Sequence, residues 1–519
     1  MLNFEAVDYA CALYVNSVLV GTHQGGYLPF SFKLPEAEIE AESGQPQDYE
    51  IILAVKDPSD SGLQQRGKQS LNPKGIYYRA TSGIWQTVWM EALPKENSIS
   101  GFSYAVNSDL SGARLVAFTE KPGKLLIKIA MPDNSICELQ GNSGEYLDFA
   151  PGLPRLWSGQ DPWLYHCHLY LFNVDGKSVD EAASYFAIRS IELGHPHDGH
   201  AKDYKAEGRA KRPVFLLNKK AIFLNAPLDQ AYWPESGLTA PSDEAIVFDI
   251  ESMKKLGFNG LRKHVKIESR RFYWHADRIG MLVAQDAVSG GQNRAKGSFK
   301  IALAMIFGIH LEDCSQKAMT LAGRYNKENQ KEFESELLSM LALLKEHPSI
   351  MLWSVFNESW GQYESKRIAE LVKKADPGRP VDAVSGWHDN GAGELRSRHT
   401  YIVRLKNASK RDKRPYFISE YGGYNLAVNG HLWDPERRFG YRFFNTKKEL
   451  EIAYSRLIRR QLIPLIKNGL TGAVYTQLSD VETETNGFYT YDRKVLKMDR
   501  ELIIRLNNEI MDAFGKTQS

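Results

Sequence analysis

Cysteine is scarce in this sequence, which has four cysteines in 519 residues. Cys11, Cys137, Cys167 and Cys314 lie far apart, and no pair has the spacing of a metal-binding or redox motif. Four cysteines are also too few for a disulfide scaffold. We therefore expect reduced, buried thiols. The first basic residue is Lys33, so the sequence shows no charged n-region and no recognisable secretory signal, and we expect a cytoplasmic location.

Long apolar runs and an excess of one charge are also missing. The best apolar run, Ile301–Leu311, is interrupted by His310 and falls short of the roughly 18–20 residues that span a membrane. Lysine and arginine total 65 against 63 for aspartate and glutamate, a formal net charge of +2. This balance gives no overall attraction to nucleic acid or to an anionic membrane, so we expect neither as a partner. The basic segment Arg396–Arg414 is interpreted as a solvated loop, with a preference for acidic glycans left open.

Short apolar or alternating runs between turn residues predict strands up to about residue 193. The first set ends near Pro94–Asn97, so two β-sandwiches, 1–96 and 97–193, fit better than one. Residues 194–212 are rich in glycine, lysine, aspartate and histidine, which is typical of a linker. This linker contains four potential metal ligands, His195, His197, Asp198 and His200. So polar a stretch fixes no ligand geometry, and a solvated linker is the favoured interpretation.

From residue 213 to 519 the pattern alternates between strands and helices. Ser242 is a predicted N-cap, and Gly257 lies where that helix should end. A second predicted helix places Phe333 and Leu337 on one apolar face and ends before Pro348. The predicted strands are Ala221–Asn225, Asn259–His264, Met281–Asp286, Ile350–Glu358, Pro380–Val384, His399–Val403, Pro415–Glu420 and Gly472–Gln477. Eight strands in this length predict a (β/α)₈ barrel, which takes about 250 residues.

Several of these strands end in a polar residue directly after apolar ones. Glu358 follows Asn357 at the end of the fourth strand, and Glu420 ends the seventh. In a barrel these ends meet at one mouth, where the two glutamates would face each other. Two such carboxyl groups can supply a proton donor and a nucleophile at neutral pH, as glycoside cleavage requires. For either glutamate alone, a strand cap or a surface salt bridge is the common alternative.

The segment Trp353–Gly361 resembles the Asn-Glu acid/base signature of glycoside hydrolase family 2, and Phe417–Gly423 resembles its nucleophile segment. Phe258–His264 and Ser82–Trp89 are similar to further segments of that family. Tyr14–Asn16 and His23–Phe30 match its N-terminal sandwich. The resemblance implies a partial, galactose-binding-like jelly-roll sandwich, an immunoglobulin-like sandwich and a (β/α)₈ barrel. It begins partway into the first sandwich, so we expect that domain to be truncated and prone to aggregation.

The resemblance implies a role for each matching residue. Glu358 would be the general acid/base and Glu420 the nucleophile of a retaining hydrolase. Asn357 would hold the 2-hydroxyl of the sugar, and Arg262 would favour the ionised form of Glu420. Tyr401 would lie near the nucleophile. Three further residues are candidate sugar contacts, Asp229, His264 and Trp360, with structural hydrogen bonding or core packing as their alternative.

Three departures from the family pattern bear on the substrate. No Glu and His pair two residues apart follows the third strand, so we expect no metal and no other cofactor. The stretch Glu484–Gly487 stands where β-glucuronidases carry an Asn-X-Lys motif, and a glutamate there would repel a sugar carboxylate. The eighth strand ends Val474–Gln477, without the tryptophan of many members. These features leave the identity of the sugar open.

The resemblance favours an exo-acting β-glycosidase, with β-D-galactosides as the first choice of substrate. β-Glucosides, β-mannosides and α-L-arabinopyranosides remain alternatives, and glucuronides are disfavoured. A non-catalytic carbohydrate-binding protein is the alternative from another class, although it would not need both glutamates. The expected partner is an oligosaccharide or small glycoside, and homo-oligomer formation stays open.

Overall fold

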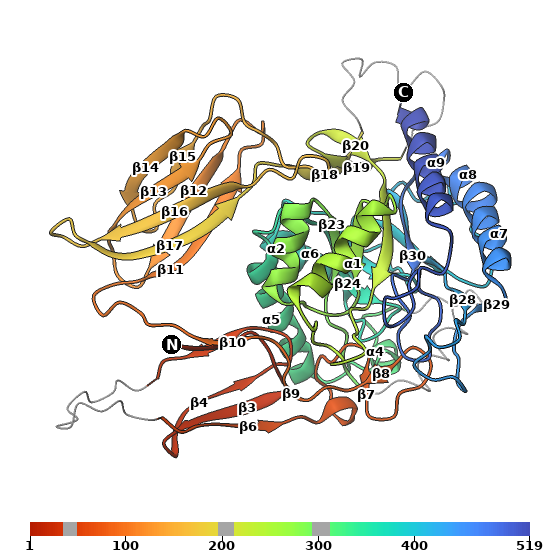
Figure 1. Ribbon diagram of the computed structural model, residues 1–519, viewed down its shortest axis with the longest axis horizontal. Helices are drawn as coiled ribbons and strands as arrows, with labels where there is room; N and C mark the ends of the chain where they lie inside the picture. Colours follow the sequence, from red (N-terminus) through yellow and green to blue (C-terminus); the bar gives the residue numbers. More distant parts are fainter. Residues whose placement is uncertain (35–48, 196–211, 293–311, 519) are drawn as a thin grey trace.

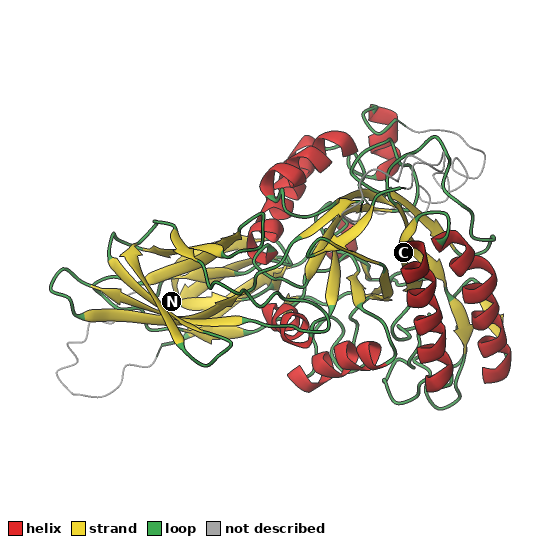
Figure 2. Cartoon of the chain, turned by 90° about the horizontal axis from the view of Figure 1, so that it is seen from above, coloured by secondary structure: helices red, strands yellow, loops and turns green. Residues whose placement is uncertain are grey.

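The structure is a computed structural model that describes residues 1–34, 49–195, 212–292 and 312–518. Two β domains lie on one side of an α/β barrel (Figures 1 and 2). Most of the predicted linker, with His197, Asp198 and His200, lies outside the described residues, as does the apolar run that ends at Leu311. Within the described part of the chain, no helix combines the length and the apolar character needed to cross a bilayer.

The first domain contains two small antiparallel sheets, ordered β10-β1-β5 and β4-β3-β6 in the described residues. Their strands are β1 (Leu2–Phe4), β3 (Ala10–Val15), β4 (Val18–Gln24), β5 (Phe30–Phe32), β6 (Ile51–Lys56) and β10 (Val88–Met90). Alternation along β3 buries Cys11, Leu13 and Val15 between these sheets. Short ladders pair β2 (Val7–Asp8) with β9 (Gly83–Ile84) and β7 (Gln69–Ser70) with β8 (Tyr78–Arg79). A 3₁₀ turn, η1 (Ser59–Ser61), precedes β7.

The second domain is a β-sandwich of two antiparallel sheets, ordered β11-β12-β15 and β14-β13-β16-β17 among the described strands. The strands are β11 (Ile99–Val106), β12 (Ala113–Thr119), β13 (Lys124–Ala130), β14 (Ile136–Asn142), β15 (Leu147–Phe149), β16 (Tyr165–Phe172) and β17 (Ser178–Phe186). Every second residue of β16, from Tyr165 to Leu171, faces the core. This period of two is the signal that predicts the sandwich from sequence.

The barrel sheet has eight parallel strands in the described residues, in the order β25-β24-β23-β22-β21-β30-β27-β26. They are β21 (Leu224–Asp229), β22 (Gly260–Lys263), β23 (Leu282–Asp286), β24 (Ile350–Asn357), β25 (Val381–Ser385), β26 (Arg396–Thr400), β27 (Tyr416–Gly422) and β30 (Leu470–Thr476). This order follows the chain around the barrel, with the seam between β25 and β26. The prediction of β domains followed by an eight-stranded barrel is therefore confirmed.

Two predicted barrel strands are displaced. Ala221 and Ile222 belong to β20 (Lys220–Ile222), which forms a separate sheet with β18 (Ile191–Gly194) and β19 (Val214–Leu217). The apolar run continues into β21, so the sequence pattern does not show the break. The sixth strand, predicted at His399–Val403, lies at Arg396–Thr400, and Ile402 and Val403 are exposed. The predicted strand lies too far along the chain because the prediction relied on these two apolar residues.

Helices surround the barrel, and their ends follow the capping signals. Ser242 Oγ accepts a hydrogen bond from Ala245 N at 3.2 Å, and Gly257 adopts φ 90° just beyond the end of α1. Phe333 and Leu337 are buried on α5, as predicted. The helices are α1 (Asp243–Lys255), α2 (Arg270–Ile279), α4 (Gln316–Ala322), α5 (Lys327–Leu344), α6 (Ser365–Ala375), α7 (Lys447–Leu457), α8 (Ile463–Ile466) and α9 (Arg500–Gln518). A π-helical turn, η3 (Ile458–Leu462), joins α7 to α8, and β28 (Tyr424–Leu426) pairs with β29 (Arg442–Phe444).

All four cysteines are free, but they are not all buried. Cys11 and Cys167 lie in the sandwich cores, whereas Cys314 is exposed in the loop before α4 and Cys137 is half-buried. The expectation of buried thiols is therefore wrong for Cys137 and Cys314. Cys137 stands on the edge strand β14, where one face of the sheet meets solvent, and Cys314 lies in a surface loop.

Candidate active site

The carboxyl ends of the barrel strands bring the predicted polar residues together. Arg262 comes from β22, Asn357 and Glu358 from the end of β24, and Glu420 from β27. His264 follows β22 directly, and Tyr401 follows β26. Parallel strands present their carboxyl ends at the same mouth, so residues far apart in sequence meet there.

Glu358 and Glu420 form a close carboxylate pair. One oxygen of each and one ring nitrogen of His399 all lie within 4.8 Å of one another. The Glu420 side chain is 5% exposed and the Glu358 side chain 17%. Glu358 is thus the carboxylate that solvent reaches more readily, and Glu420 lies deeper in the barrel.

Glu420 is held by donors on both of its oxygens. Oε1 accepts a hydrogen bond from Arg262 Nη1 at 3.0 Å, and Oε2 accepts one from the Tyr401 hydroxyl. His399 Nδ1 lies 3.4 Å from Oε2. Burial alone would raise the pKa of Glu420, but the positive charges of His399, Arg262 and His264 lower it to about 2. The arrangement therefore keeps Glu420 ionised at neutral pH.

Arg262 is the centre of this polar layer and is completely buried. Its guanidinium donates to both oxygens of Asp286, at 3.0 and 2.9 Å. It also donates to Glu420, to Asn357 Oδ1 at 3.1 Å and to the Ser419 carbonyl at 2.9 Å. These bonds use all five N–H donors of the side chain. Because Arg262 donates to Asn357 Oδ1, the Asn357 NH₂ is on the other side of the amide, and no described residue accepts a hydrogen bond from it.

Glu358 is positioned by its backbone and by His399. It adopts φ 49° and Ser359 adopts φ 61°, both in the left-handed region, which non-glycine residues rarely occupy. Such strain at the end of a strand is a mark of functional positions. His399 Nδ1 lies 3.0 Å from Glu358 Oε1, and its Nε2 lies 2.9 Å from Ser385 Oγ. His399 thus faces both carboxylates and is fixed from behind by a hydroxyl.

Tyr401 is fixed in a similar way. Its ring stacks on Tyr441, with ring centroids 4.0 Å apart and an angle of 10° between the planes. Its hydroxyl lies 3.1 Å from Thr476 Oγ1 at the end of β30. Burial and then the nearby Glu420 charge raise the pKa of Tyr401 well above its ordinary value, so the phenol stays protonated and donates.

Of the three candidate sugar contacts, only His264 borders the carboxylate pair. Its Nδ1 lies 2.8 Å from Asp286 Oδ2 and 3.9 Å from Glu420 Oε1. Asp229 Oδ2 accepts from Lys263 Nζ at 2.7 Å and Oδ1 accepts from Ala231 N, which favours the structural alternative for this residue.

Trp360 packs against the first domain. Its ring makes an edge contact with Tyr77 at 5.8 Å between centroids and lies 5.7 Å from the Arg66 guanidinium carbon. The Trp360 indole N–H is buried, and no described residue accepts its hydrogen bond. The Trp360 ring therefore contacts residues of the first domain, and its N–H has no acceptor among the described residues.

Sequence reasoning missed three residues of this site. His399 stands inside a polar strand that gives no apolar signal, and Ser385 ends β25 just beyond its predicted limit. Asp286 is the polar residue that ends the third predicted strand, as Glu420 ends the seventh, but no role is predicted for it from the sequence. Glu358, His399 and Glu420 form the set among the described residues that could hold a metal ion. Arg262 and Tyr401 donate to Glu420, and His399 Nδ1 lies within 3.4 Å of an oxygen of each carboxylate.

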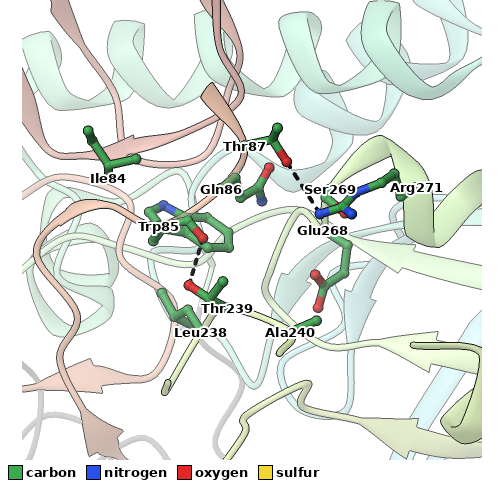
Figure 3. Close-up of a pocket in the computed structure, with 10 residues that line it drawn as sticks. All are labelled: Ile84, Trp85, Gln86, Thr87, Leu238, Thr239, Ala240, Glu268, Ser269 and Arg271. Carbon is green, nitrogen blue, oxygen red and sulfur yellow. Dashed lines mark hydrogen bonds between the residues drawn. The ribbon is translucent and has the colours of Figure 1, made fainter. Parts of the chain in front are cut away.

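A cavity of about 270 Å³ lies where the first domain meets the barrel (Figure 3). Arg271 Nη2 donates to Thr87 Oγ1 across it, and Thr239 donates to the Trp85 carbonyl. Its lining residues are Ile84, Trp85, Gln86, Thr87, Leu238, Thr239, Ala240, Glu268, Ser269 and Arg271. The carboxylate pair does not line this cavity, which is separate from the candidate active site.

Comparisons with known proteins show which family the barrel domain matches. Residues 209–495 match the family model described as "Glycosyl hydrolases family 2, TIM barrel domain". A β-galactosidase of Thermoanaerobacter pseudethanolicus is 24% identical over 83% of this chain and 52% of its own length. A β-glucuronidase of Streptococcus agalactiae is 24% identical over 84% of this chain and 73% of its own length. The chain thus spans about half the length of the first relative and about three quarters of the second.

Solved structures share the fold at lower identity. A family 2 β-galacturonidase from Eisenbergiella tayi superposes with a TM-score of 0.68 at 18% identity, covering 98% of this chain and 87% of its own. A β-glucuronidase from Ruminococcus gnavus gives 0.66 at 16% identity, covering 98% of this chain and 84% of its own. Both β domains and the barrel are included in these superpositions.

Proposed function

Since the family match spans more than half of the chain, the chain belongs to glycosyl hydrolase family 2, and we propose that it hydrolyses terminal β-glycosides with retention of configuration. The observation that supports this most directly is the carboxylate pair, with oxygens of Glu358 and Glu420 within 4.8 Å of each other. Retaining glycosidases hold their carboxyl groups about 5–5.5 Å apart, whereas inverting enzymes leave about 6.5–9.5 Å for a water molecule.

In the first step Glu420 attacks the anomeric carbon while Glu358 protonates the glycosidic oxygen. The bond from the anomeric carbon to the leaving oxygen breaks as the bond to Glu420 forms, which gives a covalent glycosyl-enzyme. In the second step Glu358, now ionised, takes a proton from water as the water displaces Glu420. Two inversions at one carbon restore the β configuration.

The surrounding residues suit these two roles. With its pKa lowered to about 2, Glu420 is ionised when substrate arrives. Tyr401 and Arg262 bind one oxygen each, so they stabilise the carboxylate that leaves in the second step. Glu358, being more exposed, can exchange its proton with water. The free NH₂ of Asn357 is oriented to donate to the 2-hydroxyl of the sugar, a contact that strengthens in the transition state.

For the sugar itself we infer β-D-galactosides first, on the names of the relatives with the matching barrel. β-Glucosides, β-mannosides and α-L-arabinopyranosides are the neutral alternatives. Uronides are the second candidate, because another relative is a β-glucuronidase. Glu484 argues against them, since it is buried and its ionised carboxylate would carry the same charge as a uronate, although burial raises its pKa above the ordinary value.

A panel of nitrophenyl β-glycosides tests the proposal. We expect turnover of at least one neutral glycoside, and a loss of about 10⁴- to 10⁶-fold in kcat for Glu420→Gln. Glu358→Gln should lose about 10²- to 10⁴-fold on nitrophenyl glycosides and less on dinitrophenyl glycosides, whose leaving group needs no proton. Glu370→Gln, on the exposed face of α6, is the matched control and should retain full activity.

The alternative class makes a different prediction. A non-catalytic carbohydrate-binding protein would bind a sugar in calorimetry and turn over no glycoside of the panel. Equal rates for wild type and Glu420→Gln would also remove the proposed nucleophile.

A further inference from the structure

A loop of the first domain reaches the barrel mouth beside the carboxylate pair. Arg66 N and Gly67 N donate to the Ser289 carbonyl at 3.0 and 2.9 Å, and Arg66 Nη1 donates to the Gly291 carbonyl at 2.8 Å. Gly67 adopts φ 62°, and a Cβ there would lie 2.8 Å from the Val265 carbonyl oxygen. Only glycine permits this approach, which places the next residue, Lys68, over the site.

Lys68 is buried, with 8% of its surface exposed. Its ammonium nitrogen lies 5.6 Å from the centre of the Tyr78 ring. Lys68 and His264 are among the residues that line a cavity of about 10 Å³. Within the described residues, this ammonium makes no hydrogen bond and no ion pair. The Lys68 nitrogen is not among the fully buried polar atoms that lack a partner in the described residues, so the ammonium reaches solvent and is open to a ligand.

The charge of Lys68 acts on the catalytic centre. Burial is the largest influence on the pKa of three neighbouring groups. It raises the pKa of Glu484 above its ordinary value, although the positive charge of Lys68 opposes this rise, and the same charge helps to lower the pKa of Glu420 and of His264. Lys68 and His264 line the same small cavity, and His264 Nδ1 lies 3.9 Å from Glu420 Oε1, which places Lys68 near the nucleophile.

Glu484 lies on the loop after β30 and is 2% exposed. The Tyr78 hydroxyl donates to its Oε2 at 2.6 Å, and Gln477 Nε2 donates to the same oxygen at 3.2 Å. Among the described residues no hydrogen bond reaches Glu484 Oε1. The site thus presents a free donor on Lys68 and a free acceptor on Glu484, which are too far apart to form an ion pair with each other.

We propose that Lys68, supplied by the first domain, and Glu484, supplied by the barrel, bind hydroxyl groups of a neutral sugar and select it over the corresponding uronide. A hydroxyl accepts from the ammonium and donates to the carboxylate, so it satisfies both groups. A uronate carboxylate only accepts, and it would face Glu484 with like charge. The inference deepens the proposed function and rests on it.

Two variants test this pairing, Lys68→Met and Glu484→Gln. Lys74→Met is the control, because this lysine is exposed in the loop that follows β7. The substrates are the nitrophenyl glycoside that wild type cleaves best, its 3-, 4- and 6-deoxy analogues, and the corresponding uronide. On the parent glycoside, Lys68→Met should lower kcat/KM by about ten- to a hundredfold, the loss of one charge-assisted hydrogen bond.

The analogues identify the contact. On the one analogue that lacks the bound hydroxyl, Lys68→Met and wild type should have the same kcat/KM, because the partner is already missing. Glu484→Gln should narrow the preference for the neutral glycoside over the uronide by about tenfold or more. Lys74→Met should behave as wild type throughout.

Three results would overturn the proposal. The first is an equal kcat/KM of Lys68→Met and wild type on the parent glycoside. The second is a loss of kcat/KM in Lys68→Met by the same factor on every deoxy analogue. The third is a preference of wild type for the uronide. Thermal unfolding, with Lys68→Gln as a second variant, separates a folding defect from a binding defect. If wild type cleaves no glycoside, the proposed function fails, and calorimetric titration with the free neutral sugar and its uronate then decides the Lys68 contact by itself.

Discussion

Replacing Arg262 with methionine removes the guanidinium that joins the two halves of the site. Arg262 and Asp286 form an ion pair of 2.9 Å with side chains 0% and 2% exposed. Arg271 and Asp243 form one of 2.8 Å with side chains 52% and 39% exposed. The two pairs have nearly the same length and differ mainly in burial, so Arg271→Met is a matched control.

The expected magnitudes follow from burial. Arg262→Met leaves Asp286 and Glu420 as buried carboxylates without their cation, which should cost about 3–5 kcal/mol of the free energy of unfolding. The exposed pair should cost about 0–1 kcal/mol. An opposite charge at this distance lowers the pKa of a carboxyl by about 1–3 units. The apparent pKa of the acid limb in the pH profile of kcat/KM should therefore rise by about 1–3 units in Arg262→Met. The neighbouring His399 should still lower the pKa of Glu420 in part.

The same shift has a consequence for stability. In wild type the ionised Glu420 stabilises the folded state fully above its ordinary pKa of 4.5, and this contribution is lost as pH falls towards about 2. In Arg262→Met the pKa of Glu420 in the folded state should lie closer to its ordinary value. The pH range over which this contribution to stability is lost should therefore be narrower. Urea unfolding between pH 2.5 and 7, with pH profiles of kcat/KM, measures both effects. Equal unfolding free energies for Arg262→Met and Arg271→Met, with unchanged acid limbs, would refute the reasoning.

Three further substitutions probe single contacts. Tyr401→Phe removes the hydrogen bond to Glu420 and should lower kcat by about ten- to a hundredfold at an unchanged melting temperature, a split that steady-state kinetics and calorimetry resolve. Gly386→Ala should lower the free energy of unfolding by about 1–3 kcal/mol and remove most of the activity, because Gly386 adopts φ 100° and a Cβ there would lie 2.6 Å from the His399 ring. Full activity of this variant would show that catalysis does not need His399 in a fixed position. Ser242→Ala should cost about 1 kcal/mol by loss of the α1 cap and leave kcat/KM unchanged, which chemical unfolding and a rate assay can check.

The sequence predicts the residues that end strongly apolar strands. Glu358 and Glu420 follow runs that are buried at every position, so both the strand and its polar end can be recognised from the pattern. Asp229 ends its strand in the same way, but Lys263 on the neighbouring strand binds it. Which polar end faces the mouth thus depends on neighbours in space, which the sequence pattern of a single strand does not show.

The residues that the sequence does not predict depend on local polarity or on distant contacts. His399 lies on β26, whose Arg-Ser-Arg-His-Thr sequence has no apolar period, so the predicted strand shifted towards Ile402 and Val403. Lys68 reaches the site from another domain, through backbone bonds to Ser289 more than two hundred residues away. Contacts of that range follow from the packing of the two domains.

The first-formed anomer of the released sugar tests the central claim most directly. Carboxylate oxygens within 4.8 Å of each other are closer than the roughly 6.5–9.5 Å between the carboxyl groups of inverting enzymes, so we expect the product to keep the β configuration. Proton NMR of the reaction during the first minutes, before the sugar equilibrates, should show the β anomer ahead of the α anomer. An initial excess of the α anomer would contradict double displacement by Glu358 and Glu420.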